Sequence, residues 1–321
     1  MDGLPIEEQT GLNYACQTGN MHACGHDMHT AMLLGAAKLL KQHESEIIGT
    51  VKLMFQGAEE IFEGASDMIA NGVLEDPKVD AAVMIHVVAG TQIPTGSILV
   101  SAPGISAPAA DYFTIRVQGK GCHGSAPQNG VDALTAAAHI LIALQELQAR
   151  ELPTTSQAVL TVGTMQAGSA GNVIADRAVM TGTIRSYDED TRAFLKKRLT
   201  EISKAIAGAF RADVVVELGS GCPTLVNDKT LAESVYSILT DLLGKEKTIR
   251  TPQGIAGGGS EDFAYISQNV PSLMLALAAG EPEKGYQYSQ HHPKVMFDES
   301  VLEIGAAVYA ATAINWLNSM N

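Results

Sequence analysis

The order of hydrophobic and polar residues in the first hundred positions predicts alternating helices and strands. Over His29–Gln42 the apolar side chains recur every three or four residues, which is the spacing of one helix face. A second, short helix is predicted at Gly64–Ala70. Gly49–Phe55 and Asp80–Val88 are predicted as strands, and the second is apolar enough to be buried on both faces. This alternation is typical of an α/β layer with a mainly parallel sheet flanked by helices.

The middle of the chain follows a different order, β-α-β-β-α-β, which is that of a ferredoxin-like unit. These elements are predicted at Tyr112–Gln118, Val131–Arg150, Gln157–Met165, Ala178–Ser186, Asp188–Phe210 and Asp213–Leu218. Helix and strand then alternate again, at Lys229–Leu243, Glu261–Gln268, Ser272–Ala278 and Ser300–Leu317. We therefore expect a discontinuous α/β domain of residues 1–107 and 219–321. An inserted ferredoxin-like α+β domain of residues 108–218 would interrupt it.

Composition narrows the classes of function. The chain has 321 residues, with 21 Lys and Arg against 35 Asp and Glu, so its net charge of −14 argues against nucleic acids and anionic membranes as partners. No apolar run is expected to cross a bilayer, which takes about 18–20 residues. The four cysteines are too few and scattered for a disulfide framework, and the N-terminus lacks the pattern of a signal peptide. We expect a cytoplasmic protein.

Metal-ligating residue types gather at four places in the predicted outer domain. Met21–His29 contains three histidines, Cys24 and an aspartate just before a helix, and a Cys-x-His pair can supply two ligands from one turn. Helix capping by Asp27 among surface histidines is the structural alternative. Glu59-Glu60 directly follows a predicted strand. Such a pair is either a solvated turn or, beside a metal, one ligand and one proton acceptor.

The other two places are single histidine signals. His86 lies within an apolar strand, where a histidine is either a satisfied core residue or, near the strand end, a site residue. Gln290–Pro293 contains His291 and His292, and its alternative is an ordinary polar loop. Together the four places predict a metal site whose spacings differ from those of a zinc finger and from H-E-x-x-H.

Sequence motifs also bear on two other functions, dinucleotide binding and serine hydrolysis. Gly119–Gly124 matches G-x-G-x-x-G and would suit an NAD-dependent oxidoreductase, but Pro127 and Asn129-Gly130 delay the helix that should bind the pyrophosphate. No G-x-S-x-G sequence is present, so serine hydrolysis has no support.

The chain resembles the dinuclear metallo-aminoacylase/carboxypeptidase family, in its branch of hippurate hydrolases, N-acyl-amino-acid amidohydrolases and auxin-conjugate hydrolases. The matching stretches are MDGLPIEEQTG, NMHACGHDMHT, FQGAEE, IHV, GKGCHGSAPQNGVDAL, AGNVIADRAVMTGTIRS, GGGSEDFAY and HHPKVMFDE. They cover the chain in the family's order. The resemblance implies a metal-binding α/β domain that carries an inserted ferredoxin-like lid, which also forms dimers.

The resemblance assigns a role to each matched residue. It implies two divalent metal ions (Zn, Mn, Ni or Co) held by five ligands: Cys24, His26, Glu60, His86 and His291. Glu59 becomes the general base, and His123 becomes the lid histidine that polarises the scissile carbonyl. Asn172 and Arg185 would form a fork for the carboxylate of the substrate.

The implied reaction is hydrolysis of an N-acyl amino acid by a metal-bound hydroxide, in a homodimer or higher homo-oligomer whose own or partner lid supplies His123. The family's N-terminal helix and early strands have no counterpart before Met1, so we expect either a misassigned start or a truncated form with an incomplete sheet. This leaves an inactive, truncated metal-binding or interaction protein as the alternative, besides the oxidoreductase.

Overall fold

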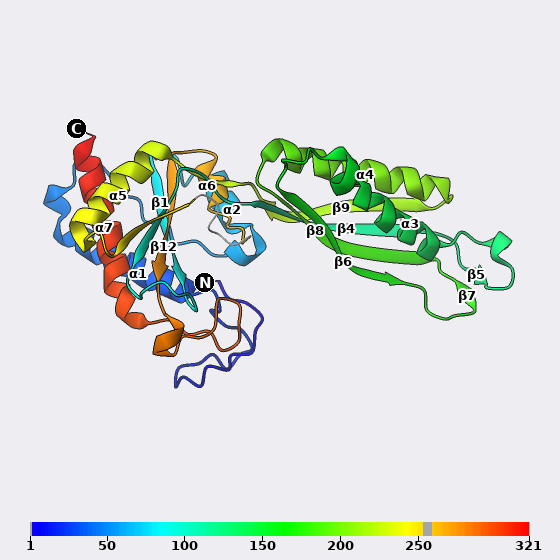
Figure 1. Cartoon of the computed structure of the whole chain (residues 1–321), viewed down its shortest axis with the longest axis horizontal. Helices are drawn as coiled ribbons and strands as arrows, with labels where there is room; N and C mark the ends of the chain where they lie inside the picture. The colour runs from blue at the N-terminus through cyan, green and yellow to red at the C-terminus, as the bar shows by residue number, and fades with distance from the viewer. Residues whose placement is uncertain (1, 253–258, 321) are drawn as a thin grey trace. The chain divides into compact units, whose positions relative to one another are not determined.

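A computed structural model describes residues 2–252 and 259–320 of the chain (Figure 1). Two units are distinguished, Met1–Ser106 with Leu225–Asn321, and Ala107–Thr224. The predicted insertion began at 108 and ended at 218. The later border follows from a strand that was predicted to stop at Leu218 and instead continues to Cys222.

The first unit contains one mixed sheet in the order β1-β12-β2-β11, in which β1 and β12 are parallel, β2 and β11 are parallel, and β12 and β2 are antiparallel. Its main strands are β1 (Ala82–Val88), β2 (Ile98–Ser101), β11 (Thr248–Thr251) and β12 (Ser272–Ala278). A separate pair is formed by β3 (Gly104–Ala107) and β10 (Leu225–Asn227). Its helices are α1 (His26–Gln42), α2 (Gly64–Ala70), α5 (Lys229–Leu243), α6 (Ala264–Ser267) and α7 (Leu302–Ser319).

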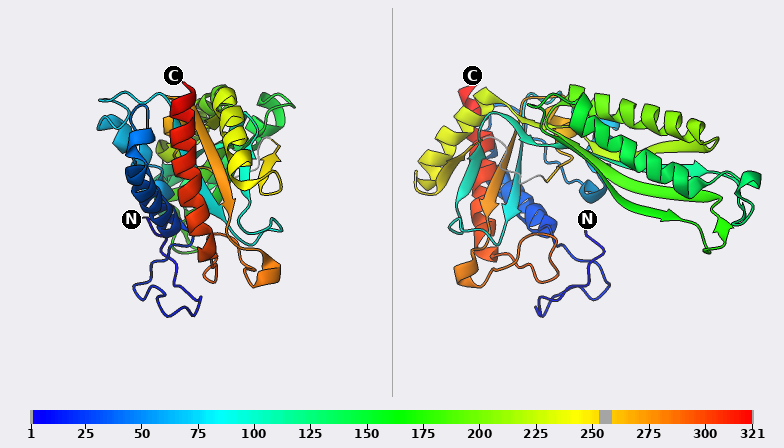
Figure 2. Two further views of the ribbon diagram at one scale, coloured as in Figure 1. Left: turned by 90° about the vertical axis from the view of Figure 1, so that its left-hand side faces the viewer. Right: turned by 45° about the vertical axis from the view of Figure 1, so that its right-hand side comes forward.

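Helix α7 packs against both α1 and α5, and α1 and α5 pack onto the sheet (Figure 2). The core they enclose includes Ile85, Leu275 and Met32, none of which is more than 1% exposed. α5 begins where predicted because the Asp228 carboxylate accepts a hydrogen bond from the Leu231 N–H at 2.8 Å. The α/β class is thus confirmed.

One predicted strand, Gly49–Phe55, is wrong. Residues 51–57 belong to no helix or paired strand within the described chain. An extended segment becomes a strand only when a neighbour accepts its hydrogen bonds. Residues 48–57 and the first part of β1 line the same cavity of about 820 Å³, and no strand among the described residues pairs with this segment.

The C-terminal helix is the one element, among the residues that the structure describes, that is long and apolar enough to cross a bilayer. This stretch is Glu299–Ser319, whereas no such segment was expected from the sequence. Gly305, Ala306 and Val308 of α7 are buried, and the helix packs on α1 and α5. About 33% of this span is buried, so α7 packs against the other helices along one side.

The second unit is the predicted β-α-β-β-α-β arrangement. Its antiparallel sheet has the order β6-β8-β4-β9, and α3 and α4 lie side by side on one face (Figure 1). The elements are β4 (Ala109–Gln118), α3 (Ala133–Glu146), β6 (Ala158–Ala167), β8 (Arg177–Ser186), α4 (Glu189–Ala209) and β9 (Asp213–Cys222). A small pair, β5 (Cys122–His123) and β7 (Val173–Ile174), extends one end of the unit.

Candidate metal centre

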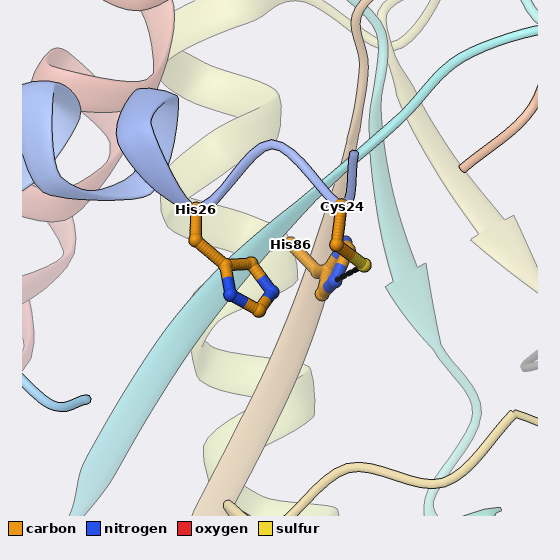
Figure 3. A group of neighbouring side chains, drawn as sticks. All are labelled: Cys24, His26 and His86. Atoms are coloured by element: carbon orange, nitrogen blue, oxygen red, sulfur yellow. Dashed lines mark hydrogen bonds between the residues drawn. The ribbon is translucent and has the colours of Figure 1, made fainter. Parts of the chain in front are cut away.

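Cys24 and His26 lie on either side of Gly25, at the point where α1 begins. Gly25 has a φ of 81°, and a Cβ at this position would lie 2.4 Å from Cγ2 of Val87. Both observations require glycine. The tight turn places Cys24 in the loop and His26 on the first residue of the helix, and both side chains approach His86 of β1 (Figure 3).

Hydrogen bonding fixes the tautomer of His86. Its Nδ1 lies 2.7 Å from the carbonyl oxygen of Val87, so Nδ1 carries the hydrogen and donates it. Nε2 then has a free lone pair and lies 3.4 Å from Sγ of Cys24. A histidine with this orientation is prepared to bind a metal through Nε2, with the carbonyl as its outer partner.

The loop that carries His291 is attached to the same two segments. The His291 N–H donates to the carbonyl oxygen of Ala23 at 2.8 Å. The side-chain amide of Gln290 donates to the Val87 carbonyl at 2.7 Å. His291 has a φ of 65° and projects its Nε2 to 3.6 Å from Oε1 of Glu60.

Glu59 and Glu60 lie on a single 3-10 turn, Glu59–Ile61. The carboxylate of Asp2 accepts hydrogen bonds from the N–H of Glu59 at 2.6 Å and of Glu60 at 3.2 Å. Oδ2 of Asp2 is also 3.4 Å from Nδ1 of His26, and Nε2 of His26 is 3.8 Å from Oε2 of Glu59. Asp2 therefore orients both His26 and the turn.

The ligand atoms form two overlapping groups that share Cys24. Cys24, His26 and His86 make one group and Cys24, Glu60 and His291 the other, with the ligand atoms of each within 4.8 Å of one another. A thiolate common to two groups can bridge two cations, and thiolate, imidazole and carboxylate suit a borderline divalent metal. The five residues that the sequence predicted as ligands thus lie together, and their donor set fits a two-metal centre.

The electrostatics of this cluster favour a bound cation. Burial, reinforced by neighbouring carboxylates, raises the pKa of the Cys24 thiol, and burial with the negative charge of Asp2 raises the pKa of Glu60 to about 7. Burial lowers the pKa of His86 to about 4, so this imidazole is neutral at pH 7. Burial is the largest cause that raises the pKa of Glu59, and the negative charge of Glu261 is the next largest. These acids resist ionisation because they are buried beside neutral imidazoles. Bound divalent cations would supply the positive charge that favours their ionised forms.

The predicted site residues of the second unit are divided between its two ends. His123 of β5 pairs with Val173, and the adjacent Gly124 N–H donates to the Asn172 carbonyl at 2.7 Å, so His123 and Asn172 are neighbours. Arg185 lies toward the far end of β8, where it pairs with Ala110. Measured along the strand, Arg185 is about 26 Å from Arg177, where β8 begins. Asn172 and Arg185 of one chain therefore lie apart, and a fork made of the two would take one residue from each of two chains.

The glycine motif at Gly119–Gly124 does not precede a helix. It leads into β5, a turn over Pro127–Asn129 follows, and α3 begins only at Ala133. The helix N-terminus that would hold a pyrophosphate is displaced from the glycines, so the dinucleotide-binding alternative has no structural support.

Several residues of the centre were not predicted as site residues. Asp2 contacts His26 directly. Gln290 donates to the Val87 carbonyl, which also accepts from His86. Nε2 of His29 accepts a hydrogen bond from the Val87 N–H at 2.9 Å. Glu261 and Asp262 lie beside Glu59. The acidic pair of the GGGSEDFAY stretch was the one available signal for the last two; Gly257 and Gly258 of that stretch lie outside the described residues.

Comparison with known proteins then identifies the family. Residues 1–315 match the family described as Peptidase family M20/M25/M40. The chain belongs to this family. Among solved structures, the M20 family member YxeP of Bacillus subtilis, described as a dinuclear metal-binding peptidase, is 31% identical with a TM-score of 0.77. The alignment covers 99% of this chain and 80% of that one.

Two relatives are similar to this chain over most of its length. The N-acetyl-L-cysteine deacetylase of Bacillus subtilis is 36% identical over 94% of this chain and 69% of its own length. The IAA-amino acid hydrolase ILR1-like 2 of Arabidopsis thaliana is 36% identical over 99% of this chain and 71% of its own length. The resemblance to a dinuclear metallohydrolase family, and to its amidohydrolase branch, is thereby confirmed.

Proposed function

We propose that this chain is a metal-dependent amidohydrolase that cleaves N-acyl amino acids to a carboxylate and a free amino acid. The observation that carries the proposal is the pair of ligand groups that share Cys24, with Glu59 beside them. Relatives named as a deacetylase of an N-acetyl amino acid and as a hydrolase of an amino acid conjugate support the substrate class.

Each site residue has a separate role in the proposed hydrolysis. Cys24, His26, Glu60, His86 and His291 would hold two divalent cations, which when bound lower the pKa of a water ligand and polarise a carbonyl. Glu59 accepts the proton of the attacking water and returns it to the leaving nitrogen. His123 donates a hydrogen bond to the oxygen of the scissile carbonyl. Asn172 and Arg185 bind the carboxylate of the substrate, each from a different lid.

The proposal includes a homodimer or higher homo-oligomer, because residues at opposite ends of one lid can meet at one substrate only if two copies contribute. It also places the enzyme in the cytoplasm, which agrees with four free cysteines, Cys16, Cys24, Cys122 and Cys222.

The test of this function is turnover measured beside metal content. The protein is loaded with Zn²⁺, Mn²⁺, Ni²⁺ or Co²⁺ and assayed on N-acetyl, N-benzoyl and indole-3-acetyl amino acids. We expect free amino acid to be released, chelation to abolish release, and metal to restore it. Stoichiometric metal binding with no release from any substrate would instead identify the inactive metal-binding protein.

Cys24 gives a test of the ligand assignment that needs no turnover. A thiolate bound to Co²⁺ produces a charge-transfer absorption in the near ultraviolet, and metal binding deprotonates the thiol despite its raised pKa. We expect the Co²⁺-loaded protein to show this band and Cys24→Ser to lack it. Cys16→Ser is the matched control, since Cys16 lies outside the ligand groups found among the described residues. A band that survives in Cys24→Ser would exclude Cys24 from the centre.

A further inference from the structure

The turn that carries Glu59 and Glu60 has an unfavourable backbone conformation. The residues that flank its 3-10 segment, Ala58 and Phe62, have φ values of 60° and 57° and are not glycines. Such positions persist only when the surrounding structure holds them. Something other than local preference must therefore keep this turn in place.

The two ends of the turn are drawn together closely. The N–H groups of Glu63 and Gly64 both donate to the Ala58 carbonyl at 3.2 Å. A Cβ on Gly64 would lie 1.8 Å from the carbonyl oxygen of Gly57, so only glycine permits this closure. The loop from Gln56 to Ala65 is thus closed at its base.

Asp262 binds both sides of this base. Its side chain is fully buried, Oδ1 accepts from Nε2 of Gln56 at 2.6 Å, and Oδ2 accepts from the Ala65 N–H at 2.9 Å. Gln56 precedes the turn and Ala65 follows it. The two donors reach different oxygen atoms, so an amide at this position would present an NH2 group to one of them.

We propose that Asp262 is a positioning residue that keeps the Glu59–Glu60 turn closed by binding Gln56 before it and Ala65 after it. Its effect on turnover rests on the function proposed above, whereas its effect on the turn does not. No hydrogen bond joins Asp262 to a predicted ligand, although its carboxylate lies within 4.8 Å of that of Glu59, so Gln56→Met, which keeps this charge, separates the two effects. Asp262 acts through the backbone that carries the turn.

Three variants separate this role from a general contribution to stability. Asp262→Asn removes one acceptor, and Gln56→Met removes the donor before the turn while keeping the side-chain length. The double variant Gln56→Glu with Asp262→Asn exchanges amide and carboxylate, so that the amide introduced at position 262 can donate to the carboxylate introduced at position 56 and still accept from Ala65. Asp228→Asn is the matched control, because Asp228 is an acid of the same unit that caps α5.

The first measurement is hydrogen exchange of the metal-free proteins. We expect the amides of residues 59–65 to exchange about ten times faster in both single variants and to return close to the wild-type rate in the exchanged pair. Asp228→Asn should leave them unchanged. Wild-type exchange of this segment in Gln56→Met and in folded Asp262→Asn would overturn the proposal, and if Asp262→Asn does not fold, Gln56→Met and the exchanged pair decide.

The second measurement is turnover per bound metal. Loss of an outer partner of this kind is expected to lower kcat about 10- to 100-fold with KM little changed, and the exchanged pair should recover most of it. A merely structural role would lower the yield of folded protein and leave kcat of the folded fraction unchanged, which would overturn the proposal. If the wild type itself releases no amino acid, the proposed function fails, and hydrogen exchange still decides the role of Asp262.

Discussion

Glu59→Gln is expected to abolish most turnover while both metals stay bound. Glu59 lies 3.8 Å from His26 and next to the buried Glu261, and an amide at this position keeps the shape but cannot accept a proton. Loss of a general base costs about 100- to 10,000-fold in kcat. Metal content measured by elemental analysis should remain that of the wild type.

Glu60→Gln should behave differently, because Oε1 of Glu60 belongs to the ligand group with Cys24 and His291. An amide is a weaker ligand than a carboxylate, so at least part of the metal should be lost with the activity. Glu63→Gln, an exposed change on the same loop, is the control and should alter neither. Equal metal loss in the Glu59 and Glu60 variants, or near-normal turnover of Glu59→Gln, contradicts this division of roles.

Helices and strands whose bounds are set by their own or adjacent residues were predicted well from the sequence. α5 and β12 have the predicted bounds, since one has a capping aspartate and the other a continuous apolar run. The short strands β2, β3, β10 and β11 were missed, because three or four residues are too few to show a period. Gly49–Phe55 has the composition of a strand, but pairing depends on a neighbour that the local sequence does not specify.

The residues of the metal centre divide in the same way. Those in short motifs were predicted, whereas those placed by contacts distant in sequence were not. Cys24, His26 and the acidic pair stand out because metal-ligating residue types are clustered in short motifs. Asp262 and Gln56 did not, because a hydrogen bond between residues so far apart in sequence leaves no pattern in either segment. Asn172 and Arg185 lie apart within one chain, because a ten-residue strand carries Arg185 away from the turn that holds Asn172.

His123 has a side chain suited to donate a hydrogen bond. Its Nδ1 accepts from the Ser125 N–H at 3.1 Å and lies 2.7 Å from the Ser125 hydroxyl oxygen. In the neutral ring the hydrogen is therefore on Nε2, which is the tautomer that can donate to a developing oxyanion. The ring is exposed, so Nε2 is accessible to a ligand.

His123→Ala is expected to lower kcat about 100- to 1,000-fold without loss of metal, as removal of one oxyanion donor does elsewhere. His123→Gln keeps an N–H donor and should retain more turnover than His123→Ala. His139→Gln, a change on α3 of the same unit, is the control and should be as active as the wild type. An active His123→Ala variant would make this histidine an ordinary surface residue.

A mixing experiment shows which copy of the chain supplies His123. His123 lies on β5, at one end of the second unit, whereas Arg185 lies about 26 Å along β8 from Arg177 at that same end, so a single N-acyl amino acid can contact both only when two chains contribute. Glu59→Gln and His123→Ala are each inactive, but in a mixed dimer one site combines an intact Glu59 with an intact His123 of the other chain. Unfolding and refolding the two variants together should restore about a quarter of wild-type activity, because half of randomly formed dimers are mixed and each has one complete site. If the mixture stays inactive although mixed dimers form, His123 serves the site of its own chain, and an Arg185 that binds the same substrate would have to come from the other chain.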